Sequence, residues 1–467
     1  MTVIGALLLA GAVLPASARA DDVAALRQEL GSLMKEYAER VAALEARIAQ
    51  LESQAVAAAS VPAPAPAPAP TPGRGGGGGT AFNPAISVIL AGNYAQLSQD
   101  AASYHIAGFI PSGGEAGPGQ RSFNLGESEL TLSANVDPYF YANLTASIHS
   151  DNSISVEEAF FKTLTLPAGL LIKGGRFFSA IGYLNEVHAH AWDFVDQPLV
   201  YQAFLGGQVG QDGVQVKWVA PTDILLELGV EGGNGRTFPG TPRDHNGLGG
   251  RAAFVHVGND IGDSASWRIG LSWMQRQAEE RSYADLDAAG QPVLDPTGLP
   301  VINAFTGSSR IWAVDALLKW SPHGNPTQHN LKLQGEYLQR TEDGTLAFDT
   351  AGARVAGDYR SQQSGWYLQG VYQFLPRWRT GLRYDALSSG TPRISGLPPL
   401  LALPATYFPQ LLAATPKRYT WMLDFNPSEF SRLRVQYALD DARATLRDRQ
   451  LLLQYLYSIG AHGAHKF

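Results

Sequence analysis

The chain contains no cysteine, so neither disulfide bonds nor thiolate metal ligands are available to it. Charged residues are scarce, at 16% of the 467 positions, and 42 acidic residues outnumber 35 basic ones. Because no block of lysine and arginine is present, we expect no nucleic-acid partner. After residue 20, no apolar run approaches the roughly 18 residues that a membrane-spanning helix needs. These absences argue against a disulfide-stabilised scaffold, a helical membrane protein and a nucleic-acid-binding protein.

The C-terminal third instead shows alternation between apolar and polar residues, in segments of about ten residues. In SRLRVQYALD (431–440), Leu433, Val435 and Tyr437 fall on one face of an extended chain, whereas Arg434 falls on the other. A soluble sandwich could show this alternation, but it would not need aromatic apolar faces repeated strand after strand. The pattern therefore predicts a transmembrane β-barrel in the outer membrane of a Gram-negative bacterium.

Three segments precede the predicted barrel. Residues 1–20 have an apolar core and end in Ala-Arg-Ala, as a cleavable signal peptide does. Residues 21–54 carry apolar side chains at heptad-like spacings, which predicts a periplasmic coiled-coil helix and therefore a homo-oligomer. The alternative is an amphipathic helix that packs on its own domain. Residues 55–80 are rich in Pro, Ala and Gly and predict a semi-rigid spacer with a flexible end.

Residues 81–467 are predicted to form an all-β transmembrane barrel of about sixteen antiparallel strands. We expect strands near 85–96, 124–136, 139–149, 153–164, 170–178, 211–219, 222–232, 250–258, 264–276, 309–320, 329–340, 361–374, 376–387, 416–426, 429–440 and 447–459. Long loops are expected at 97–123, 179–210, 277–308, 341–360 and 388–415. The other connections are short turns, which belong on the periplasmic side and place both termini there.

The parity of each strand separates a lipid-facing side from a polar, lumen-facing side. The acidic residues that we expect to line the pore are Glu127, Glu129, Glu157, Asp223, Glu227 and Glu231. The basic ones are Arg377, Arg379, Arg383, Arg418, Arg432 and Arg434. In a closed barrel the two sets would face each other and create a transverse field, and adjacent arginines would favour anionic or zwitterionic solutes. The alternative is that these charges are solvated or paired with their neighbours.

One long loop, 179–210, contains a possible metal site. Glu186, His188 and His190 are two residues apart, so in an extended segment all three side chains point the same way and could bind zinc. A lone His-x-His is a weak signal, because loop histidines often make local hydrogen bonds. We expect the alternative, in which the loop folds inward as a constriction and uses the histidines for packing, with no cofactor.

The same loop also carries an acidic residue beside its histidines. Asp193 could suggest a hydrolase, but no serine nucleophile in a recognisable setting accompanies it. We therefore expect no enzymatic activity. Trp192, Phe194 and Tyr201 make the segment rich in aromatic residues, as an inward-folded constriction loop would be.

The order of segments, from signal peptide and coiled coil to barrel and terminal Phe467, resembles trimeric outer-membrane porins with periplasmic coiled coils, including the phosphate-selective and dicarboxylate-channel groups. The resemblance implies a trimeric channel, surrounded by outer-membrane lipid, that passes small hydrophilic solutes without covalent chemistry. It also implies that the barrel-assembly machinery recognises Phe467.

Shorter segments resemble a second group. FNPAISVILAGNY (82–94), FNLGESELTLSANVDPYF (123–140), residues 175–208 and DGVQVKWVAPTD (212–223) are similar to proteins labelled zinc-regulated TonB-dependent outer-membrane receptors. That label implies zinc acquisition, although this chain departs from such receptors in having no plug domain and fewer strands. A third hypothesis is a structural barrel that links the outer membrane to the cell wall through the coiled coil.

Overall fold

The computed structural model describes Lys35 and residues 84–113, 116–287, 289–397 and 408–460. The chain divides into two units, Met1–Gly79 and Thr80–Phe467. Apart from Lys35, the expected signal peptide, coiled coil and spacer lie outside the described residues, as does Phe467. Within the described ranges, no helix is both long and apolar enough to span a lipid bilayer.

The described part of the second unit forms one antiparallel sheet of 18 strands. The strands are β1 (Ala85–Leu97), β2 (Ser122–Leu125), β3 (Ser128–Asn135), β4 (Phe140–Ile148), β5 (Ile154–Thr163), β6 (Leu170–Phe178), β7 (Gly210–Val219), β8 (Leu225–Gly233), β9 (Gly250–Ile261), β10 (Ala265–Ala284), β11 (Ile302–Trp320), β12 (Asn330–Phe348), β13 (Val355–Leu375), β14 (Trp378–Ser388), β15 (Arg393–Ser395), β16 (Lys417–Ser428), β17 (Ser431–Asp441) and β18 (Asp448–Gly460). The helical segments are α2 (Leu199–Leu205) and the short 3₁₀ turns η1 (Ala101–Ser103), η2 (Pro167–Gly169), η3 (Ala189–Ala191), η4 (Pro322–Gly324) and η6 (Pro409–Leu411).

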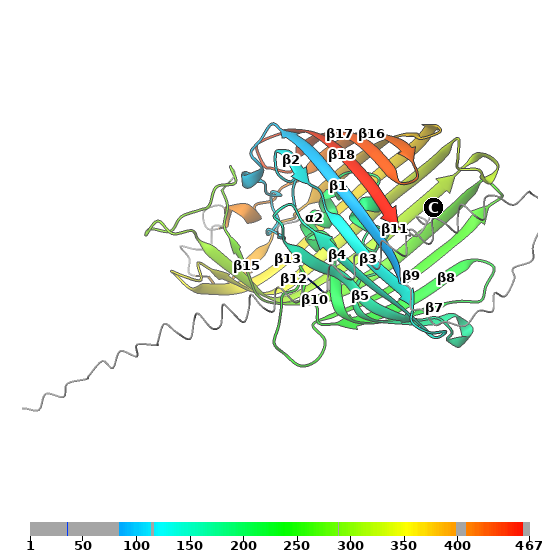
Figure 1. The fold of residues 1–467 in the computed structure, drawn as a ribbon. Helices are drawn as coiled ribbons and strands as arrows, with labels where there is room; N and C mark the ends of the chain where they lie inside the picture. Colours follow the sequence, from blue (N-terminus) through cyan, green and yellow to red (C-terminus); the bar gives the residue numbers. More distant parts are fainter. Residues whose placement is uncertain (1–34, 36–83, 114–115, 288, 398–407, 461–467) are drawn as a thin grey trace, which may run out of the picture. The chain divides into compact units, whose positions relative to one another are not determined.

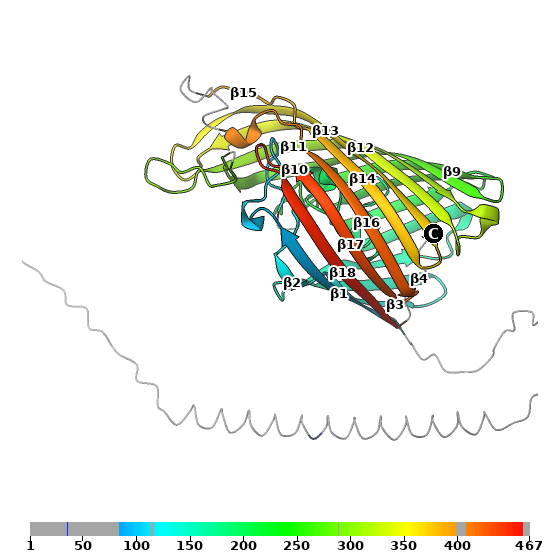
Figure 2. The same cartoon turned by 90° about the horizontal axis from the view of Figure 1, so that it is seen from above.

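The sheet closes on itself because β1 pairs with β3 along one edge and with β18 along the other. The short strands β2 and β15 add to β1 and β13, so 16 of the described strands complete the ring. Figure 1 shows the resulting barrel, and Figure 2 shows β14, β16, β17, β18 and β1 side by side and tilted. The prediction of a sixteen-stranded antiparallel barrel is thus confirmed, and each expected strand corresponds to one strand of the ring.

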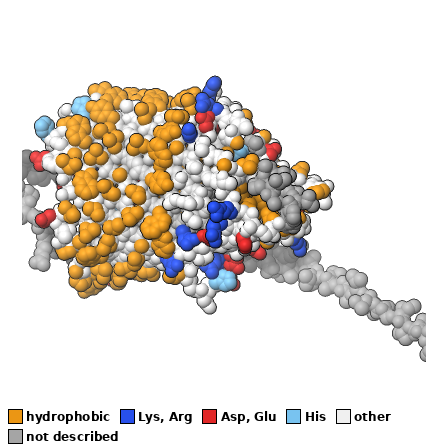
Figure 3. All heavy atoms as spheres, turned by 180° about the vertical axis from the view of Figure 1, so that it is seen from behind, with side chains coloured by type: hydrophobic (Ala, Val, Ile, Leu, Met, Phe, Trp, Pro, Cys, Tyr) orange, Lys and Arg blue, Asp and Glu red, His pale blue; other side chains and the backbone are white. Residues whose placement is uncertain are grey.

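The barrel is apolar on the outside and polar on the inside, as the alternation predicts. In β17 the outward side chains Leu433 and Tyr437 are 45% and 39% exposed, whereas the inward Arg434 and Gln436 are buried. Figure 3 shows apolar side chains spread over one face of the barrel, while charged side chains gather toward one end. An apolar outer surface of this kind suits contact with hydrocarbon.

Four neighbouring strands, β10 to β13, are longer than the sequence suggested and extend beyond the ring at the loop end (Figure 1). The expected loops 277–308 and 341–360 therefore shorten to 285–301 and 349–354. Beyond the barrel these strands pack a small apolar core that includes Phe305, Leu346 and Tyr359.

The connections divide between the two ends of the barrel as expected. Turns such as 376–377 and 429–430 are short and lie at the end where β1 begins and β18 finishes. The longer connections lie at the opposite end, and one of them, residues 179–209, folds into the barrel. We refer to it as the inner loop, and Figure 1 shows its helix α2 surrounded by strands.

Candidate functional site

The inner loop fills part of the barrel interior, where apolar side chains of the loop and the wall pack together. Every residue of α2 is buried, and the helix packs against inward side chains of the barrel wall such as Met274, Ile311 and Leu338. Pro198 precedes the helix, and Gly206 ends it in a left-handed conformation with φ of 68°. Our expectation that the loop folds inward as a constriction agrees with this arrangement.

The first part of the inner loop is fastened to β12. The backbone amides of Tyr183 and Leu184 both donate to Glu336, at 3.1 Å each, and the Tyr201 hydroxyl donates to the same carboxylate at 2.9 Å. A β-carbon on Gly182 would come within 2.2 Å of Glu336 Oε2, so this close approach requires glycine. Glu336 thus links the loop to the wall by accepting three hydrogen bonds from it.

Asp196 anchors the loop to the basic wall formed by β14, β16 and β17. Its carboxylate accepts a hydrogen bond from Arg383 at 2.8 Å and is ion-paired with Arg418 at 2.8 Å. Gln436 donates to the same carboxylate at 2.9 Å. Asp385 lies on the other side of both arginines, at 3.1 Å from Arg383 and 3.6 Å from Arg418. Both guanidinium groups are buried, so they are held by fixed carboxylates and not by solvent.

A second group of ion pairs lies nearer the short-turn end. Asp193 of the inner loop contacts Lys332 at 2.9 Å and Arg379 at 3.4 Å. Asp424 contacts Arg379 at 2.6 Å and Arg434 at 2.7 Å. Several close cationic partners stabilise the ionised carboxylates of Asp193 and Asp424. Asp193 therefore has a structural role, because it attaches the inner loop to the wall.

These contacts revise the expected pore lining. Arg379, Arg383, Arg418, Arg432 and Arg434 face inward as expected, but each has a carboxylate within 4 Å. The acidic and basic walls do not face each other across open water, because the inner loop lies between them and supplies its own charges. The alternative, in which the charges pair with their neighbours, therefore describes these five arginines.

Two of the expected pore-lining residues lie elsewhere. Asp223 and Arg377 are exposed and belong to the short turns between β7 and β8 and between β13 and β14. Arg377 has a φ of 72°, a turn conformation in which strand parity no longer sets the direction of a side chain. The parity rule was extended past the ends of both strands, which is why it misplaced them.

Two other expected residues, Glu227 and Glu231, face inward on β8 and are engaged by neighbours. Glu227 contacts Lys217 and His256, at 2.9 Å each. Glu231 is buried and accepts hydrogen bonds from the Ser179 hydroxyl at 2.6 Å and from the Ala180 amide at 2.8 Å. Glu231 therefore fixes the point at which the inner loop leaves the wall.

The remaining acidic residues form a cluster with the histidines of the inner loop, on the wall formed by β3 and β5. His188 Nδ1 lies 3.1 Å from Glu157 and 3.3 Å from Glu129, and His188 Nε2 lies 3.1 Å from Glu158. His190 Nδ1 lies 2.7 Å from Glu129. We call Glu129, Glu157, Glu158, His188 and His190 the histidine–glutamate cluster.

Both ring nitrogens of His188 face carboxylate oxygens, so only the doubly protonated imidazolium can donate to all of them. Burial opposes that charge, but hydrogen bonds to Glu129, Glu157 and Glu158 outweigh it and hold the pKa of His188 well above its usual range. The cluster thus favours a positive charge at this point.

The cluster depends on an irregularity in β5. Adjacent residues of a regular strand point to opposite faces, yet Glu157 and Glu158 both contact His188. In the pairing with β4, Thr145 lies opposite Glu158 and Ala146 lies opposite Val156, so Glu157 is the extra residue of a β-bulge. The bulge turns both carboxylates toward the inner loop.

The expected metal-ligand set is only partly brought together. His188 and His190 lie side by side, with ring centroids 5.8 Å apart, but Glu186 points away and pairs with Lys173 at 3.5 Å. The inner loop turns at η3 and is not extended there, so a spacing of two no longer places all three residues on one face. The carboxylates near the histidines come from the barrel wall instead. Within the described residues, Glu129, Glu157 and His188 have ligand atoms all within 4.8 Å of one another.

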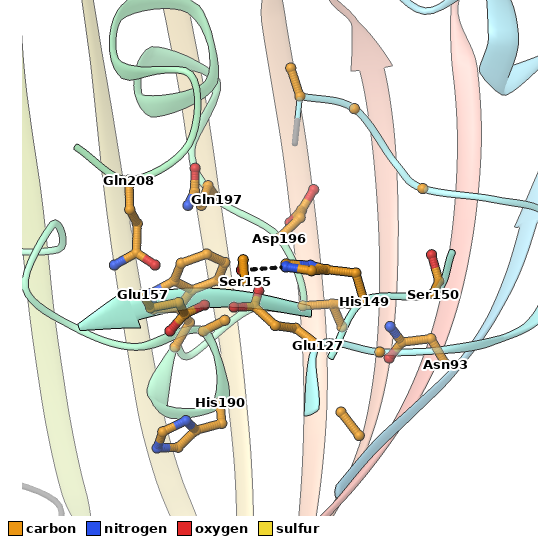
Figure 4. A pocket seen from close by; sticks show the side chains of 18 of the residues that line it. Asn93, Glu127, His149, Ser150, Ser155, Glu157, His190, Asp196, Gln197 and Gln208 are labelled. Atoms are coloured by element: carbon orange, nitrogen blue, oxygen red, sulfur yellow. Dashed lines mark hydrogen bonds between the residues drawn. The ribbon is translucent and has the colours of Figure 1, made fainter. Parts of the chain in front are cut away.

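A polar cavity of about 840 Å³ remains beside the inner loop. Its lining comes from β1, β2, β5, β6, β7, β18, the inner loop and the turn before β3, and it includes Glu127, Glu157, His190, Asp196 and Asp212. Figure 4 shows Glu127 and Glu157 next to each other on its wall, with His190 nearby. Arg176 also lines the cavity but is paired with Asp212 at 2.6 Å. Carboxylates therefore outnumber guanidinium groups around this space.

The sequence comparison places the chain in a family. Over 370 residues it is 33% identical to an uncharacterized protein of Aquifex aeolicus (strain VF5), covering 74% of this chain and 71% of that protein. The chain belongs to the same protein family. No protein-family model matches it.

Several solved structures of outer-membrane proteins resemble this one weakly. OmpTdeltaL8, a loop-deletion mutant of OmpT from Vibrio cholerae, has a TM-score of 0.48 at 10% identity, covering 81% of this chain and 99% of that one. The outer membrane channel DcaP of Acinetobacter baumannii has a TM-score of 0.44 at 13% identity, covering 81% and 96%. An anion-selective porin from Comamonas acidovorans has a TM-score of 0.46 at 11% identity, covering 81% and 99%.

Proposed function

We propose that the protein is an outer-membrane channel through which small hydrophilic solutes diffuse passively. The observation that carries the proposal is the polar cavity of about 840 Å³ between the inner loop and the wall of a closed barrel with an apolar outer belt. A barrel of this kind isolates its interior from lipid, and a loop folded inside it limits the size of what can pass.

The charges around the cavity suggest which solutes are favoured. Glu127 and Glu157 line it, whereas the inward arginines of β14, β16 and β17 are neutralised by aspartates. We therefore favour cations and neutral polar solutes over the anions and zwitterions expected from the sequence. A field set by wall carboxylates raises the local concentration of cations.

The oligomeric state is part of the same proposal. The heptad-like spacing of residues 21–54 supports a periplasmic coiled coil, and a trimer would bring three barrels together above it. Phe467 as the signal for barrel assembly, and residues 1–20 as a signal peptide, complete the proposed route to the outer membrane.

The test is a planar-bilayer recording of the purified full-length protein, combined with light scattering in detergent. We expect discrete conductance steps and the mass of a trimer, and deletion of residues 21–54 should lower the mass while leaving the barrel folded. Absence of conductance in folded protein would exclude the channel and favour the structural link to the cell wall. A purely monomeric full-length protein would exclude the trimer alone.

A further inference from the structure

The histidine–glutamate cluster has more acidic groups than its imidazoles can neutralise. Glu129, Glu157 and Glu158 converge on one imidazole, and Glu127 lies next to Glu157 on the cavity wall (Figure 4). Neighbouring carboxylates repel each other when both are ionised, and a bound cation would relieve that repulsion.

The groups are also of the kinds that a divalent transition metal prefers. Imidazole nitrogen and carboxylate oxygen are the donors of zinc and manganese sites in proteins without cysteine. The candidate donor atoms of Glu129, Glu157 and His188 lie within 4.8 Å of one another. Small side-chain rotations would place all three donor atoms at the metal–ligand distance of roughly 2.0–2.2 Å that such a cation requires.

The surroundings hold the ligands in place. His190 contacts the second oxygen of Glu129 at 2.7 Å, which is how an outer partner orients a metal-binding carboxylate. The Phe178 amide donates to Glu158 at 3.2 Å, and the Phe178 ring packs edge-on against His188 at 5.4 Å. Because Glu157 and His190 also line the cavity, a hydrated cation has a path to the cluster.

We propose that Glu129, Glu157 and the neutral imidazole of His188 bind a divalent transition-metal cation, which displaces a proton from the His188 ring, with Glu158 or water completing its coordination. The ligands come from β3, β5 and the inner loop, so a bound cation joins the loop to the barrel wall at the edge of the cavity. Metal occupancy would then fix the size of the opening between them. The site stands on this geometry and does not depend on which solutes pass through the barrel.

The test is calorimetric titration with ZnCl₂ of the full-length protein, free of affinity tags and first stripped with EDTA. We expect one site per chain with micromolar or tighter affinity. His188→Ala and Glu129→Gln should each weaken binding by about 100-fold or more, and His190→Ala by roughly 10-fold to 100-fold.

The matched control is Glu186→Gln in the same loop. Glu186 is the sequence-adjacent acid of the His-x-His segment but pairs with Lys173, so its loss should leave zinc affinity unchanged. His245→Ala, at a half-exposed histidine paired with Glu279, tests for weak surface binding. The far-UV circular dichroism of each variant must match that of the native barrel.

A second readout covers variants that fold poorly. Cobalt bound to the wild-type protein should give a visible absorption spectrum that zinc displaces, and Glu129→Gln should lose it while keeping the barrel fold. The proposal is overturned if the wild-type protein binds no metal, if binding is unchanged in both His188→Ala and Glu129→Gln, or if Glu186→Gln abolishes it. In those cases the cluster is not a metal site.

Discussion

Two of the charged places at which the barrel holds the inner loop differ in how their charge is balanced. At Asp193 and Asp196, aspartates of the loop meet arginines and a lysine of the wall in close pairs. At His188 and His190, histidines of the loop meet more wall carboxylates than they can neutralise. In the first arrangement, the aspartates and the basic side chains balance each other's charge without a ligand. The second is where a cation or a change in protonation would have an effect.

The comparison teaches that charge in a barrel interior does not by itself define a pore. Buried arginines with two carboxylate partners each, such as Arg383, fasten structural elements. Their charge is compensated within a few ångströms, so it contributes little to the field in the cavity. Glu127 and Glu157, which line the cavity, are better placed to act on solutes.

The largest expected effect follows from removing the shared partner of two buried arginines. Asp196→Ala leaves Arg383 and Arg418 without one of their carboxylates, and breaking a buried pair costs about 3–5 kcal/mol. We expect the inner loop to detach from this wall, which should raise single-channel conductance and make it fluctuate. Bilayer recordings and urea unfolding measure the two consequences.

The matched control also removes an aspartate with two arginine partners. Asp343 pairs with Arg310 and Arg360, whose side chains are 45% and 73% exposed. Exposed pairs contribute about 0–1 kcal/mol, so Asp343→Ala should change neither stability nor conductance appreciably. If Asp196→Ala behaves like Asp343→Ala, the paired wall does not anchor the loop.

A medium effect is expected on ion selectivity. Glu127→Gln combined with Glu157→Gln, recorded with EDTA present, should shift the reversal potential toward anions, by roughly twofold or more in the permeability ratio, because both carboxylates line the cavity within a Debye length of about 8 Å. Arg379→Gln should shift it much less, since Arg379 is paired with Asp193 and Asp424. A larger shift from Arg379→Gln than from the double variant would reverse the assignment of the two walls.

The barrel could be predicted from the sequence because lipid imposes a regular pattern. Each spanning strand must place apolar side chains outward at every second position, so β17 was recognisable from its own residues. The extensions of β10 to β13 were not, because their partners are other strands and the apolar core around Phe305 and Leu346. Such long-range packing leaves no local period to detect.

The site was harder to predict than the barrel for the same reason. Parity correctly turned Glu129 and Arg434 inward. It could not place Glu158, since a bulge breaks the period-two rule, and nothing in the sequence marks the bulge. Nor could it pair Asp196 with β14 and β16, because that contact depends on how the inner loop folds.

The most local expected effect concerns a third kind of buried carboxylate, with neither an arginine nor a histidine as its hydrogen-bond partner. Asp285, just beyond the end of β10, accepts a hydrogen bond from the Asn303 amide at 3.2 Å, and burial raises its pKa to about 7. Because the raised pKa favours the protonated form in the folded loop, stability should fall as pH rises from about 4 to 7 and stay low above that range.

Asp285→Asn is neutral at every pH and should remove this dependence. A rise in pKa from 3.8 to about 7 corresponds to at most roughly 4 kcal/mol, and less is expected because the loop can open locally. Hydrogen exchange of residues 289–301 at pH 5 and pH 8, corrected for intrinsic rates, should show the wild type less protected at pH 8 and the variant equally protected at both. Asp358→Asn, at an exposed position on β13, is the control and should keep the wild-type difference. Equal protection of the wild type at both pH values would show that Asp285 is stabilised by partners other than a proton.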